Sequence, residues 1–113
     1  MTTLKQYQNL LDAKGISLRE LGIQDMALER GDALAAVELL RKASTPILGG
    51  DVYVKRKANI ELAYANWYSD PNPNEASNDY LRCSWHATEN YIKNFPEPMD
   101  GEPLFVLVIG GPE

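Results

Sequence analysis

The sequence of 113 residues has one cysteine, one histidine and no long apolar run, and these scarcities exclude several classes of protein. The single cysteine, Cys83, cannot form an intramolecular disulfide, so the chain is no disulfide scaffold and suits the reducing cytoplasm. The longest apolar run, Leu104–Ile109, has six residues, whereas a membrane-spanning helix needs about 20. The first residues also lack the apolar core of a secretory signal. We therefore expect a cytoplasmic protein that does not enter the membrane.

Basic residues are scarce in the second half of the chain. Beyond residue 57 only Arg82 and Lys93 are basic, against nine acidic residues, which gives that half a charge of −7. The first half carries +2, and the whole chain −5. A nucleic-acid-binding protein needs a basic surface that replaces the counterions of phosphates, so we expect no nucleic-acid partner. The acidic half suits a basic protein partner.

The reactive side chains do not form a catalytic or metal-binding pattern. Asp79, Cys83 and His86 share one side of a predicted helix, but a rise of about 1.5 Å per residue separates the first and last by roughly 10 Å. They cannot surround a metal ion whose ligand bonds are about 2 Å long. Gly49 and Gly50 interrupt a predicted strand, so they are expected to mark a β-bulge or a close crossing of the backbone rather than a phosphate-binding loop. We predict no catalytic residue, no metal and no cofactor.

Apolar residues recur at helical spacing in three longer segments, which predicts helices over 3–14, 32–43 and 73–94. A possible capping box at residues 17–20 predicts a further single helical turn that ends at Gly22. The last helix is amphipathic and long enough to cover a sheet.

Three segments have the pattern of β-strands: 47–55, 60–65 and 104–109. A short polar connection joins the first two, which predicts an antiparallel hairpin. The third is apolar at every position, as is typical of a strand that is covered on both faces or central in its sheet. We predict an α+β fold with an antiparallel three-stranded sheet packed with about three helices, in the order ααββαβ. The chain is expected to form a single domain over residues 1–113.

Two adjacent aromatic residues close the second predicted strand. Tyrosine and tryptophan at the mouth of a loop are favoured anchors of protein interfaces. Because side chains alternate along a strand, we expect Trp67 in the core and Tyr68 at the surface. We place a candidate partner-binding surface at and after the end of this strand. Its members are Trp67, Tyr68, Asp70, Glu75 and Asp79, with Asp51 and Tyr53 from the neighbouring strand.

Four stretches of the sequence together resemble one family: GISLRELGI at 15–23, AL at 27–28, PILGGDVY at 46–53 and NWY at 66–68. They resemble the immunity protein 40 family of bacterial polymorphic-toxin systems, and ILGGDV is the most specific part. The resemblance implies a small cytosolic immunity-type domain, encoded beside a toxin, that binds and neutralises the toxin's C-terminal domain. The resemblance identifies no residue of this chain that contacts the toxin.

The residues and the resemblance agree on a protein inhibitor. An inhibitor needs a rigid surface, a few aromatic anchors and a charge complementary to its target, here a basic toxin domain such as a nuclease. Two other classes stay open. One is a ligand-binding or enzymatic α+β domain with a pocket between the long helix and the sheet, and the other is an adaptor that assembles through an edge strand. The sequence predicts no oligomeric state.

Reversal of Asp70, Glu75 and Asp79 to lysine is expected to slow association with the toxin and to reduce its dependence on salt. The reason is that acidic residues steer a basic partner during diffusional encounter. Association rates measured at low and high salt by stopped-flow fluorescence test this. Unchanged rates would remove this segment from the interface.

Overall fold

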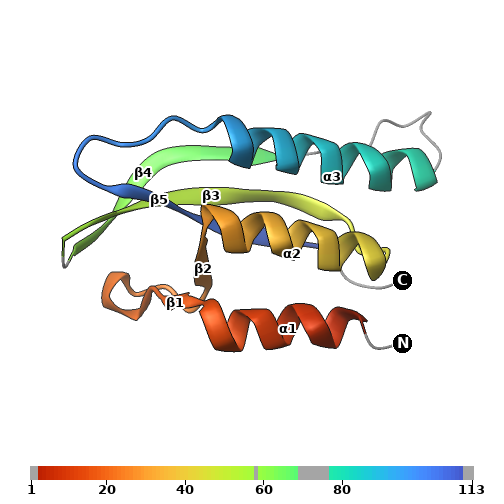
Figure 1. Cartoon of the computed structure of the whole chain (residues 1–113), viewed down its shortest axis with the longest axis horizontal. Coiled ribbons are helices and arrows are strands. Elements are labelled where there is room, and N and C mark those ends of the chain that lie inside the picture. The colour runs from red at the N-terminus through yellow and green to blue at the C-terminus, as the bar shows by residue number, and fades with distance from the viewer. Residues whose placement is uncertain (1–2, 58, 69–76, 111–113) are drawn as a thin grey trace.

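The computed structural model describes residues 3–57, 59–68 and 77–110 (Figure 1). Helices and strands alternate through most of the chain, and η1 is a single turn of 3-10 helix. In chain order the elements are α1 (Thr3–Lys14), β1 (Ile16–Ser17), η1 (Arg19–Leu21), β2 (Met26–Glu29), α2 (Arg30–Lys42), β3 (Ile47–Arg56), β4 (Asn59–Tyr68), α3 (Ser77–Asn94) and β5 (Glu102–Ile109).

The sheet has five described strands in the order β1-β2-β5-β3-β4, and each pairs with its neighbours antiparallel. The α+β class and the three α-helices are confirmed, but the predicted three-stranded sheet and the order ααββαβ are wrong. The prediction missed β1 and β2. β1 has only two residues, and β2 is Met-Ala-Leu-Glu, four residues that all favour helix over strand. β5 lies inside the sheet, between β2 and β3, as its continuous apolar run predicted.

The three α-helices line one face of the sheet, which we call the inner face. Figure 1 shows them side by side with α2 in the middle. Each contributes to one hydrophobic core, through Tyr7 of α1, Val37 of α2 and Ile92 of α3, against Val52 and Phe105 of the sheet. The aromatic rings of Trp67, Tyr91, Phe95 and Phe105 fill the space between α3 and the sheet, with centroids 4.6–6.5 Å apart.

Buried hydrogen bonds fix α3 in place over the sheet. The Trp67 indole N–H donates to Thr88 Oγ1 at 3.1 Å, and the Ile47 backbone N–H donates to Ser84 Oγ at 3.2 Å. Near the C-terminal end of α3, a part-buried bond joins this helix to α2, where the Arg30 guanidinium donates to the Ile92 carbonyl at 2.5 Å. Because a buried polar group without a partner is costly, these bonds define one register of α3 on the sheet.

Within the described residues, the opposite, outer face of the sheet is covered at one end. Leu18 and Ile23, from the segment around η1, pack on Tyr53, Leu104 and Val106 and form a second, smaller core. Gly22 ends η1 in the left-handed conformation with φ 76°, as predicted, and so returns the chain to the sheet.

Gly49 and Gly50 form the irregular start of β3. The pairing with β5 shifts register between Ile47 and Gly49, which confirms the predicted bulge. A Cβ at Gly50 would overlap the Val106 carbonyl oxygen and the Trp67 ring, and one at Gly49 would lie 2.8 Å from the Cα of Tyr68. Both glycines therefore allow neighbouring groups to approach more closely than any side chain would permit.

Gly50→Ala is expected to lower the free energy of unfolding by about 1–3 kcal/mol, because the added methyl overlaps a buried ring and a backbone carbonyl. Gly31→Ala, in the first turn of α2, is the matched control. Nothing lies within 4 Å of its Cβ position, so this change is expected to be neutral or to stabilise by up to about 1 kcal/mol. Urea unfolding curves of both variants measure the difference, and equal midpoints would contradict the packing argument.

Candidate protein-binding surface

The outer face of the sheet is open where β3 begins and where β4 and β5 end. The pairing registers set its side chains in rows across β5, β3 and β4, because partners in an antiparallel pair share a face. From the open end inwards, the rows are Val108-Gly49-Tyr68, Val106-Asp51-Asn66 and Leu104-Tyr53-Leu62.

A hollow lies in the first row because its middle residue has no side chain. Gly49 stands between Val108 and Tyr68, and the gap between them forms a shallow hollow of about 200 Å³. Leu48, the residue at the bulge, and Asp51 of the next row also line it. The hollow is thus a direct result of the glycine bulge in β3.

Apolar surface gathers around this hollow. Tyr68 is 74% exposed, and Leu48 and Val108 are 39% and 45% exposed. These three border the hollow and are among seven large hydrophobic residues that are exposed in the described part of the chain, whereas Leu62, another of the seven, lies two rows further in. Exposed apolar residues that gather in one place, unlike scattered ones, are typical of an interaction site.

A carboxylate and a phenol lie beside this apolar surface. Asp51 is half-buried, and Tyr53 is buried at the edge of the second core. Burial raises the pKa of Tyr53, and the nearby charges of Asp51 and then Asp25 raise this pKa further. The Tyr53 hydroxyl therefore stays neutral at physiological pH, and among the described residues that line the hollow Asp51 is the one acidic or basic residue.

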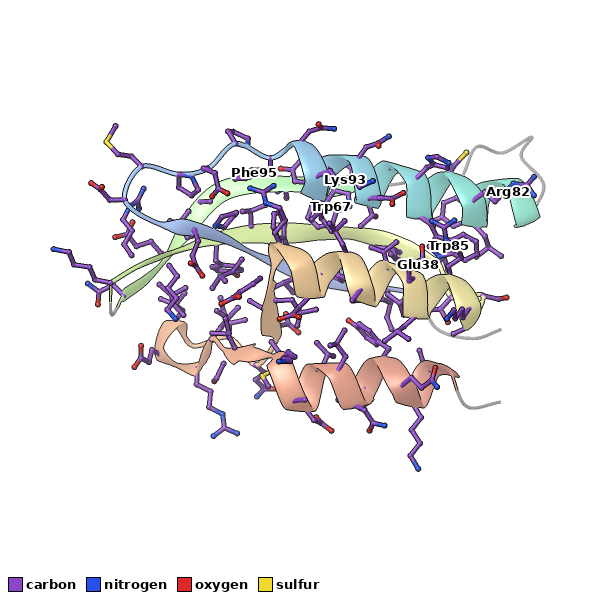
Figure 2. All side chains as sticks on the ribbon, in the orientation of Figure 1. Glu38, Trp67, Arg82, Trp85, Lys93 and Phe95 are labelled. Carbon is purple, nitrogen blue, oxygen red and sulfur yellow. The ribbon has the colours of Figure 1, made fainter. Side chains whose placement is uncertain are left out.

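Three residues of the predicted surface lie on this face: Asp51, Tyr53 and Tyr68. Tyr68 is the most exposed of them, as predicted, whereas Tyr53 is buried. Trp67 lies on the inner face, as expected of a core residue. It is 8% exposed and stacks on Tyr91, and Figure 2 shows it under α3.

The acidic residues predicted after β4 are not part of the described geometry. Asp70 and Glu75 lie outside the described residues. Asp79 lies in α3, and its side chain is outside the described part. Sequence reasoning missed Leu48 of β3 and Val108 of β5, and it included Asn66 of β4 only as the start of the predicted segment 66–79. Only the registers of those strands place them together, and the sequence carries no signal of those registers.

Other kinds of site find little support in the described part of the chain. There, no group of three or more histidine, cysteine, aspartate and glutamate residues is arranged to hold a metal ion. No α-helix within the described ranges has the length and apolar character needed to cross a membrane. The side chains of Cys83 and His86 are both exposed on α3.

Comparison with known proteins gives one family. The family model described as Immunity protein 40 matches residues 17–109, and so covers β2 to β5, α2 and α3. No curated protein and no solved structure matches the chain.

Asp51→Asn is expected to lower the pKa of Tyr53, because it removes a negative charge that opposes ionisation of the phenol. The pKa should stay above its ordinary value, since burial is the larger cause. A pH titration of the Tyr53 ring followed by NMR measures the shift. Asp12→Asn, an exposed residue of α1, is the matched control. The assignment is wrong if both variants leave the pKa where it is in the wild type.

Proposed function

The chain belongs to the immunity protein 40 family, and we propose on that basis that it binds a cognate toxin domain and neutralises it as a stoichiometric inhibitor. The family match over residues 17–109 is the observation that carries the proposal. In this function the protein acts by occupying a surface of the toxin, with no bond-making step of its own. The proposed place of action is the cytoplasm of the cell that makes both proteins.

The rigid fold suits an inhibitor of this kind. α3 is fixed to the sheet by buried hydrogen bonds, and the bulge of β3 is fixed by close packing. A surface held in one conformation loses little entropy when it binds, so more of its contact energy contributes to affinity. The rings between α3 and the sheet fill the space in which a ligand-binding or enzymatic domain was expected to have its pocket.

The charge of the chain supports a basic target. Beyond residue 57 the charge is −7, and such a field attracts a positively charged domain such as a nuclease. Steering of this kind raises association rates from about 10⁵–10⁶ towards 10⁸–10⁹ M⁻¹s⁻¹ at low salt. Fast association is useful to an inhibitor that must capture a toxin before it acts.

The alternative of an adaptor that assembles through an edge strand has less support. β4 is an edge of the described sheet, but its pairing with β3 is irregular. Val52 pairs with Ala65 and Tyr53 pairs with Leu62, so Ala63 and Tyr64 have no counterpart in β3. A bulge of this kind twists an edge and discourages the addition of another strand.

Co-expression tests the proposal. We propose that a toxin gene adjoins the gene for this chain, and the probe is the C-terminal domain that this toxin gene encodes. We expect this protein to restore growth of cells that express the toxin domain, and the two to purify together in a fixed ratio. The control is a toxin domain paired with an immunity protein of another family, which this chain should not neutralise. If both proteins are soluble and growth is not restored, the proposed function is wrong.

A further inference from the structure

The open end of the outer sheet face brings together a hollow, an exposed aromatic ring and one carboxylate. We propose that this surface, made of Leu48, Gly49, Asp51, Asn66, Tyr68 and Val108, is the docking face for the toxin domain. The toxin then supplies one apolar side chain to the hollow at Gly49 and one lysine or arginine to Asp51. This inference deepens the proposed function and rests on it.

The apolar part of the docking face has the composition of an interface centre. Tyr68 is 74% exposed at the end of β4, and Val108 and Leu48 border the hollow on the side of β5. Tyrosine is enriched among the residues that dominate binding energy, and such residues pair with pockets in well-packed centres. The face offers both halves of that arrangement: a ring that projects from the surface and a hollow beside it.

Of the two ends of the outer face, only the end that holds the docking face is left open by the described residues. The helices cover the inner face, and Leu18 and Ile23 cover the other end of the outer face. If the docking face needed only protection from water, a few more residues at η1 could extend that cover. The chain instead leaves Leu48, Tyr68 and Val108 exposed beside one another, which favours a partner that covers them on binding.

Asp51 determines the charge of that partner. It is half-buried, and the other described residues that line the hollow include no aspartate, glutamate, lysine, arginine or histidine. A carboxylate that loses more water on binding is stabilised only if it gains a cation or several hydrogen bonds. A lysine or arginine next to the inserted apolar side chain meets that need, and it agrees with the negative charge of the whole chain.

A second copy of this chain fits the docking face poorly. In a twofold dimer centred here, the same residues would face each other, so Asp51 would lie near the partner's Asp51. Two chains with a charge of −5 each also repel one another.

A small molecule also fits the docking face poorly. The hollow is shallow and measures about 200 Å³, whereas sites that enclose a ligand usually have about 300–1,000 Å³.

Two pairs of variants test the docking face, each with a control matched in chemistry. Tyr68→Ala removes the projecting ring, and Met99→Ala removes a large side chain that is 81% exposed elsewhere. Asp51→Lys reverses the charge at the hollow. Asp12→Lys on α1 makes the same change in net charge at an exposed position outside the docking face, so long-range steering is matched. Asp51→Asn is included in case the lysine disturbs folding, and circular dichroism with thermal unfolding establishes that each variant is folded.

The measurement is the Kd of each variant for the same toxin C-terminal domain as in the co-expression test, by isothermal titration calorimetry. We expect Tyr68→Ala and Asp51→Lys each to weaken binding by at least about tenfold, Asp51→Asn to weaken it less, and both controls to bind within about twofold of the wild type. Protection of growth should fall in the same order.

The remaining outcomes separate the docking face from the proposed function. If the wild type binds and protects while Tyr68→Ala and the Asp51 variants behave like their controls, the docking face is wrong and the function stands. If the wild type neither binds nor protects, both are wrong. Sedimentation gives a further check. If the docking-face variants convert a dimer to a monomer without a change in toxin affinity, the face joins two copies of this chain and the inference is overturned.

Discussion

The close approach of Trp67 to Gly50 holds α3 against the inner face of the sheet. The indole ring lies directly on the glycine, in the space that a Cβ would occupy. From there its N–H reaches Thr88, and its ring stacks on Tyr91 of α3. A side chain at residue 50 would push the ring away and weaken the attachment of α3. The position of the longest helix thus depends on the absence of one methyl group.

The neighbouring glycine shapes the other face. Gly49 pairs with Val108 on one side and Tyr68 on the other, and its missing side chain leaves the hollow between them. Close contact with the backbone at Tyr68 explains why this position also needs glycine. The missing side chains of Gly49 and Gly50 therefore have two results. The inner face is tightly packed at Gly50, and the outer face has a hollow at Gly49. A structural requirement has produced a feature that a partner is able to use.

Charge and packing make separate contributions to the proposed inhibition. The acidic second half acts over long distances and affects how fast a basic partner arrives. The docking face acts only in contact, where an apolar side chain and a cation are held together. The acidic charge follows from the composition of the chain and changes little with its conformation. The docking face exists only when three strands are paired in one register.

The sequence by itself determined the helices, the hairpin of β3 and β4, the central place of β5 and the exposure of Tyr68. These follow from local periodicity and strand alternation, which depend on residues close together in the chain. The family resemblance also rested on the sequence alone, and the family match agrees with it. Tertiary structure decided that β1 and β2 become strands: pairing with β5 outweighs the helical preference of Met-Ala-Leu-Glu in β2, and the two residues of β1 pair with β2. It also decided that Leu48, Asp51, Tyr68 and Val108 meet, since contacts between distant segments are set by strand register and a bulge, and neither can be read from neighbouring residues.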